Sequence, residues 1–396
     1  MKKSTNVIAL QIIIAGIVAC ILFANSSPAQ QPRPVYIGLS VTIHSEILQE
    51  DRNILIYLPS SYDSNKDEKF PVMFLLDGFD HFHHVSGLVS FLAWAGKIPE
   101  MIVVGISNTD RDRDLTPPHN DGIGRDAGGR GDNFLAFLAK ELIPYIDRHY
   151  RTRDYRLLVG HSLGGNFTIY NLITDPDLFD TYIAISPALG WTNNKLTSDT
   201  EKFLKKNPGL NKFLYLSMGQ EGDRMIKPIE KFTNMLVVNA PDSLRWKYSF
   251  FKNDNHLSTP HKSIYEALEI LYLGWQIQDS TLHQGLDAIL MHYQSLASRF
   301  GYVIPPPERI LNTAGYIAMD ENKKDEAIKI LSYAVELYPN SANVYDSLGD
   351  AYENKGEIEL AAKYYAMAVE KGRANMDRNL RIYRANLERV QKLLNR

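Results

Sequence analysis

One serine stands where nucleophilic chemistry needs it, in the stretch "LLVGHSLGG". Ser162 lies between Gly160 and Gly164, which gives the pattern G-x-S-x-G. Glycines at these two positions leave room for a serine on a sharp strand-to-helix turn, and the N–H groups of the following helix then face a developing oxyanion. A strand-like run, "YRLLV", precedes the pattern and a helix-like run, "FTIYNLIT", follows it. We therefore predict that Ser162 is a nucleophile. The alternative is a Gly-rich turn in which Ser162 only caps the helix.

A serine hydroxyl needs a general base, and strand-turn-helix serine sites place that histidine last in the chain. The four histidines that follow Ser162 are His256, His261, His283 and His292. The first lies in the polar loop "FKNDNHLSTP", between the last strand-like run and a helix-like run. The second falls in or at the start of that helix, and the other two lie beyond the domain. We therefore predict His256 as the base, against the alternative of a solvated loop histidine.

The acid that orients the base should follow the preceding strand, at "LYLSMGQEGDRM". Glu221 and Asp223 are both candidates there. Glu221 is nearer the strand end, where a side chain can still point into the site. Asp223 would then serve as the N-cap of the next helix. We favour Glu221 as the acid and keep Asp223 as the alternative.

Backbone N–H groups must stabilise the oxyanion, and two turns can supply them. The N–H of Leu163 follows the nucleophile directly. The second donor should come from the loop after the strand "VMFLL", where Gly78 permits a sharp turn. We predict the N–H of Phe79 as this donor. Asp77 is expected to pin the loop through backbone hydrogen bonds.

A histidine-rich stretch, "HFHH", follows in the same expected loop. His81, His83 and His84 have neither cysteine nor carboxylate ligands at metal-binding spacing beside them. We therefore predict no metal and no cofactor, and expect these histidines to line the pocket entrance. Four aromatic residues are interpreted as either pocket or core: Phe79, Phe82, Trp94 and Trp191.

Strand-like and helix-like runs alternate from residue 34 to residue 279. Continuous apolar runs such as "PVMFLL" and "MIVVGI" are typical of strands buried on both faces. Alternation of this kind predicts an α/β domain with a mostly parallel sheet covered by helices.

The character changes after Pro305-Pro306-Pro307, where no strand-like run remains. Residues recur 34 positions apart, and Gly315 thus corresponds to Gly349. The period, the small residues and "YDSLGDAY" resemble the tetratricopeptide repeat, with copies at 308–341 and 342–375. Two copies of this repeat are fewer than the number usually needed for a domain that is stable by itself. We therefore expect the helical region, 280–396, to dock on the first domain through "LDAILMHYQSLASRF". A stabilising cap is favoured over a groove that binds a partner protein.

The composition excludes some classes of protein. Hydrophobic residues make up 44% of the 396 residues, the net charge is −3, and there is no basic stripe that would indicate nucleic-acid binding. A single cysteine excludes an internal disulfide framework.

Residues 1–29 have the layout of a secretory signal, with two lysines, an apolar run and small residues before Ala29. A lipobox at Cys20 or a retained membrane anchor are the alternatives. A membrane contact is expected only if the segment is retained or lipidated. All three interpretations predict export, to the periplasm or the cell exterior.

Several motifs together resemble the putative esterase family of α/β-hydrolases, which includes S-formylglutathione hydrolase, feruloyl esterases and siderophore esterases. They are "LLDGFDHF", "VVGISNTDRDRDLTPP", "LLVGHSLGGNFTIY", "AISPALGW", "MGQEGD" and "NDNHLSTP". The resemblance covers about residues 37–273 and implies an α/β-hydrolase fold that hydrolyses a small-molecule ester through an acyl-enzyme.

Ser162 and His256 match the family's nucleophile and base. Many members have Gly-x-x-Asp near the acid, which would place it at Gly222, and Glu221 looks like a glutamate variant. Arg111 and Arg113 fall in a family loop near the site and, with Trp191, are candidates for substrate binding. An acyltransferase or thioesterase with the same triad remains a rival, as does a non-catalytic binding protein.

Overall fold

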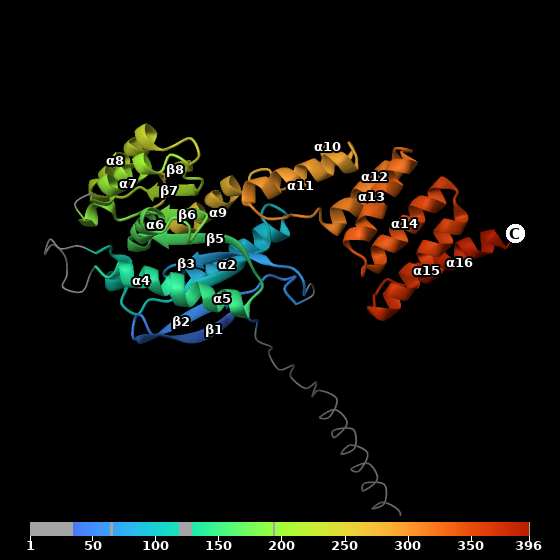
Figure 1. Ribbon diagram of the computed structural model, residues 1–396, viewed down its shortest axis with the longest axis horizontal. Coiled ribbons are helices and arrows are strands. Elements are labelled where there is room, and N and C mark those ends of the chain that lie inside the picture. The colour runs from blue at the N-terminus through green and yellow to red at the C-terminus, as the bar shows by residue number, and fades with distance from the viewer. Residues whose placement is uncertain (1–34, 64–65, 119–128, 193–194, 396) are drawn as a thin grey trace, which may run out of the picture. The chain divides into compact units, whose positions relative to one another are not determined.

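Eight strands form one sheet in the computed structural model, which describes residues 35–63, 66–118, 129–192 and 195–395. Their order is β1-β2-β4-β3-β5-β6-β7-β8, and the residues from Gly38 onward form one unit. Figure 1 colours the strands from blue for β1 to yellow-green for β8. β1 and β2 run antiparallel to their neighbours, and the other six strands are parallel. The strands are β1 (Leu39–Ser45), β2 (Glu50–Tyr57), β3 (Phe70–Leu75), β4 (Ile102–Ile106), β5 (Thr152–His161), β6 (Thr181–Ile185), β7 (Phe213–Gly219) and β8 (Arg245–Phe251). The predicted α/β fold with a mostly parallel sheet is confirmed.

Helices cover both faces of this sheet because successive side chains on a strand point to opposite faces. On β3, Met73 and Leu75 join one core with helices α2 and α9, whereas Val72 and Phe74 join the other with α4 to α8. The helices of this domain are α2 (Gly78–Trp94), α3 (Arg111–Leu115), α4 (Gly131–Phe137), the π-helical η1 (Leu138–Leu142), α5 (Ile143–His149), α6 (Leu163–Thr174), the 3-10 turn η2 (Leu189–Thr192), α7 (Lys195–Lys206), α8 (Asp223–Asn239) and α9 (Thr259–Leu271).

Two local expectations were wrong. The chain enters α2 directly after Asp77, so that His81, His83 and His84 lie on a helix rather than in a loop. A Cβ on Gly78 would come within 2.5 Å of the Gly105 backbone, which explains how tightly the chain turns there. Gly222, not Asp223, is the N-cap of α8.

Seven further helices follow in the C-terminal region. They are α10 (Asp279–Leu282), α11 (Leu286–Phe300), α12 (Glu308–Asp320), α13 (Lys324–Leu337), α14 (Ala342–Lys355), α15 (Ile358–Ala374) and α16 (Leu380–Leu394). The repeated glycines lie where paired helices cross: a Cβ on Gly315 would come within 2.6 Å of Leu331, and one on Gly349 within 2.7 Å of Tyr365. The prediction that the repeated small residues lie at helix crossings is therefore confirmed at these two glycines.

Helix α11 contacts both regions. The ring of Phe300, at its C-terminal end, lies 5.3 Å from that of Tyr155 and 5.0 Å from that of Tyr272. At the other end the N–H of Leu286 donates to the Glu326 carboxylate over 2.7 Å. These contacts agree with the expectation that this helix joins the repeats to the sheet domain.

Candidate active site

Ser162 occupies a strained turn between β5 and α6. Its φ of 61° and ψ of −115° lie outside the regions that a side-chain-bearing residue normally adopts. A Cβ on Gly160 would clash with the carbonyl of Gly164, so a residue other than glycine cannot be accommodated at Gly160 without movement. The N–H of Ser162 donates to the Ile185 carbonyl over 2.9 Å, which ties the turn to β6. The Ser162 side chain forms no cap hydrogen bond with α6, which argues against the alternative that it serves only as a helix cap.

The structure brings His256 and Glu221 together. Nδ1 of His256 lies 2.6 Å from Oε2 of Glu221, while the other carboxylate oxygen accepts from the Ser186 hydroxyl at 2.5 Å and the Gly219 N–H at 3.3 Å. Burial disfavours the ionised carboxyl, but the hydrogen bonds from His256 and Ser186 outweigh it and lower the pKa of Glu221. Glu221 is thus held as a carboxylate against the imidazole.

Asp223, the alternative acid, points elsewhere. Its side chain is 79% exposed and pairs with Lys227, one helical turn on, at 2.9 Å. Between the two candidates, only Glu221 contacts the imidazole of His256.

His161 connects the base to the serine turn. Its ring centroid lies 4.5 Å from that of His256, and it is the residue directly before Ser162. Burial and the neighbouring His256 lower the pKa of His161 to about 3. A neutral ring therefore packs beside the base at neutral pH.

The two expected oxyanion donors begin two helices. Leu163 is the first residue of α6 and Phe79 the second of α2, and the first four N–H groups of a helix have no partner within it. Asp77 precedes α2 in the left-handed conformation, with φ 53°. Its carboxylate accepts from the Asn108 amide at 2.6 Å, and this contact helps to hold the turn.

Arg111 links these two turns instead of projecting freely into the site. Its guanidinium donates to both Asp77 oxygens, at 2.6 and 2.9 Å, and to the His161 carbonyl at 3.1 Å. Two salt bridges likewise engage Arg113, at 2.7 Å to Glu50 and to Asp114. The geometry therefore gives both arginines structural contacts, and their predicted contact with substrate stays a prediction.

The aromatic candidates separate in space. Phe82 is buried in the core, whereas Phe79 is 81% exposed at the start of α2. Trp94 lies at the far end of that helix. Trp191 belongs to η2, and its side chain lies outside the described part of the chain. The interpretation that all four aromatic side chains form a single pocket is therefore wrong.

Sequence reasoning missed Ser186, Asn108 and the packing role of His161. Ser186 and Asn108 follow the carboxyl ends of β6 and β4, the sheet edge where polar residues converge in a parallel sheet. Their position directly after predicted strands was the sequence signal that could have identified them as site residues.

His81, His84 and His261 form a second histidine group. Nδ1 of His81 lies 3.0 Å from Nε2 of His84, whose Nδ1 lies 3.1 Å from His261. Burial and the neighbouring histidines lower the pKa of His84 to about 4. Within the described residues no set of three metal-binding side chains is arranged to hold an ion.

None of the helices in the described ranges has the length and apolar character required to cross a membrane.

Comparisons with known proteins match both regions. A family model described as "Putative esterase" matches residues 45–262, more than half of the chain, and one described as "Tetratricopeptide repeat" matches residues 308–341 and 342–370. Ferri-bacillibactin esterase BesA of Bacillus subtilis is 28% identical over 239 residues, covering 53% of this chain and 81% of that protein.

Solved structures agree with these matches. An IroE-like serine hydrolase from Shewanella oneidensis has a TM-score of 0.67 and 28% identity, covering 76% of this chain and 99% of its own. An uncharacterised protein from Capnocytophaga ochracea has a TM-score of 0.65 at 17% identity and covers 89% of this chain and 99% of its own, a likeness of fold alone.

Proposed function

The chain belongs to the putative esterase family and is an esterase, and from this premise we propose that Ser162, His256 and Glu221 act as its catalytic triad. The hydrogen bond between His256 and Glu221, beside the strained turn of Ser162, is the observation that carries the proposal. A base oriented by a carboxylate next to a nucleophile is the arrangement that activates a serine.

The proposed reaction has two halves. Ser162 Oγ attacks the ester carbonyl carbon while its proton passes to Nε2 of His256, and Glu221 stabilises the imidazolium through Nδ1. The oxyanion receives the N–H groups of Leu163 and Phe79. His256 then returns the proton to the leaving alkoxide, and the alcohol departs from an acyl-enzyme. Water attacks the acyl-enzyme with His256 again as base, which releases the acid and restores the serine.

We further propose that the substrate is an ester of the siderophore or aromatic acyl class. The similarity to a ferri-bacillibactin esterase supports this class. The layout of residues 1–29 supports export as the setting. The two repeats offer an additional surface for contact with another protein.

Ser162→Ala tests the triad. We expect kcat/KM to fall on the order of 10⁴-fold for p-nitrophenyl acetate and for the best substrate of a panel that includes a trilactone siderophore. Ser198→Ala changes an exposed serine on α7 and should retain full activity. Unchanged hydrolysis by the Ser162 variant, or failure of a fluorophosphonate probe to label the wild type there, would contradict the proposal.

The same panel with added alcohols separates hydrolysis from its rival, acyl transfer. Preferential formation of new esters at low alcohol concentration would identify a transferase.

A further inference from the structure

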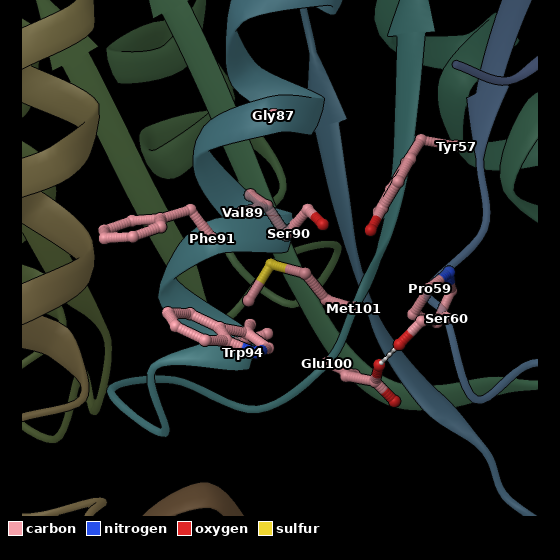
Figure 2. A pocket seen from close by; sticks show the side chains of 11 residues that line it. Tyr57, Pro59, Ser60, Gly87, Val89, Ser90, Phe91, Trp94, Glu100 and Met101 are labelled. Atoms are coloured by element: carbon pink, nitrogen blue, oxygen red, sulfur yellow. Dashed lines mark hydrogen bonds between the residues drawn. The ribbon is translucent and has the colours of Figure 1, made fainter. Parts of the chain in front are cut away.

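A cleft of about 470 Å³ opens at the far end of α2 (Figure 2). It lies among Tyr57 at the end of β2, Trp94 at the end of α2, and Glu100 just before β4. Ser162 and Glu221, in contrast, follow the carboxyl ends of β5 and β7. Because β3 to β8 are parallel, the cleft lies at the opposite edge of the sheet from the proposed triad. It is a separate site.

The walls of this cleft are rich in aromatic surface. Trp94 is 84% exposed and Phe91 54%, and their ring centroids are 6.1 Å apart. Tyr57 stands across the cleft from Trp94, as Figure 2 shows. Neighbouring large aromatic side chains that are open to solvent form an apolar patch of the kind that marks ligand or partner sites.

Glu100 places a negative charge in the cleft. Its carboxylate accepts from the Ser60 hydroxyl at 2.6 Å, from the Ser61 hydroxyl, and more weakly from the Ser61 N–H at 3.4 Å. All these donors are neutral, and none of the described residues that line the cleft is basic. Within the described ranges Glu100 forms no salt bridge. The carboxylate is therefore hydrogen-bonded but has no counter-charge.

We propose that this cleft binds an organic ammonium ion. A cation gains from the face of an aromatic ring when it lies within about 6 Å of the ring, most of all a tryptophan. Trp94 and Tyr57 supply aromatic rings on two sides of the cleft, and Glu100 supplies the charge that a substituted ammonium needs and a neutral apolar molecule does not. The source of the ammonium is either a free amine or a lysine side chain of another protein, since both present the same chemistry.

Choline and its uncharged isostere 3,3-dimethylbutan-1-ol test the proposal by calorimetric titration of the purified full chain. We expect choline to bind with a Kd on the order of millimolar, because cation–π contacts and one ion pair at a solvent-open cleft supply only modest free energy. The isostere should bind at least about fivefold more weakly. Equal binding of the two probes, or no binding of choline, would overturn the proposal.

Two variants locate the site. Glu100→Gln and Trp94→Leu should each weaken choline binding at least about fivefold, and Glu100→Gln should leave binding of the isostere unchanged. Glu230→Gln, at an exposed glutamate of α8, is the matched control and should bind choline like the wild type. Hydrolysis of p-nitrophenyl acetate should be unchanged in all three variants, which verifies that they fold. Choline affinity that survives both cleft variants would place the binding elsewhere and contradict the proposal.

A trimethyl-lysine peptide separates the two sources. Tighter binding of the peptide than of choline, lost in Glu100→Gln, supports a protein lysine. The reverse order supports a free amine.

Discussion

Two buried carboxylates, one in the sheet domain and one in the repeat region, are exposed to the same degree but have different hydrogen-bond donors. Glu221 and Asp346 are both 8% exposed. Glu221 accepts hydrogen bonds from an imidazole, a hydroxyl and a backbone N–H. Among the described residues, the side chain of Asp346, on α14, accepts hydrogen bonds from the amide of Asn386 alone, at 3.1 and 3.2 Å.

Burial opposes ionisation of both carboxyl groups, and their hydrogen-bond donors decide the direction in which each pKa moves. Donors around Glu221 lower its pKa below the usual value. Burial raises the pKa of Asp346 to about 6, the amide of Asn386 opposes this only in part, and the nearby Asp350 adds to it. Burial alone therefore does not predict the charge of a carboxyl group, whereas the number and charge of its donors do.

Removing the charge from Glu221 should produce the largest effect. Glu221→Gln should lower kcat on the order of 10³- to 10⁴-fold with p-nitrophenyl acetate, because a neutral amide cannot stabilise the imidazolium of His256 and can select the wrong tautomer. Asp223→Asn, two residues away, is the control and should stay within about twofold of the wild type. If Asp223→Asn were the damaging change, the roles assigned to these two carboxyl groups would have to be exchanged.

The second test removes a buried charge from the repeat region, where its removal should stabilise the fold. The pKa of Asp346 is raised in the folded chain, so ionisation of this group favours unfolding. The loss of folding stability is absent below the pKa of the unfolded chain, about 4, and grows as the pH rises. It is complete above the folded pKa of about 6. Asp346→Asn should therefore stabilise the helical region by about 2 kcal/mol at pH 7.5 and have little effect near pH 4. Hydrogen exchange of the amides of α14 to α16 measures this. A gain that is independent of pH would show that Asp346 is not the titrating group.

The two regions also differ in how much their sequence predicts. Repeat packing is local, since Gly315 and Gly349 meet side chains of the next helix in the same hairpin. A period of 34 residues was therefore enough to place both crossings. The serine turn was predictable for a similar reason, because Gly160, Ser162 and Gly164 are neighbours in the chain.

Partners far apart in the chain were harder to predict. Glu221 was favoured over Asp223 by its distance from the strand end, but its contact with Ser186 depends on how β6 and β7 align in the sheet. The histidines after Asp77 were misplaced because a polar run resembles a loop, whereas a left-handed residue and a close glycine start a helix there at once. Such features arise from three-dimensional packing that no local pattern encodes.

The smallest expected effect concerns a single donor to Glu221. Ser186→Ala removes the 2.5 Å hydrogen bond and should raise the pKa of Glu221 toward its usual value, with a fall in kcat of about three- to tenfold and little change in KM. The pKa of Glu221 is lowered in the folded chain, so its stabilising contribution is present above its unfolded value, near 4.3, and is lost as the pH falls through the folded value. Ser186→Ala should therefore be less stable than the wild type at pH 6 and approach it at low pH.

A double-mutant cycle gives this test its sharpest form. If Ser186 acts through the charge of Glu221, Ser186→Ala should have almost no further effect on kcat when Glu221 is already glutamine. If the two substitutions instead reduce kcat additively, Ser186 supports the site by packing, and the donors around Glu221 are not what distinguishes it from Asp346.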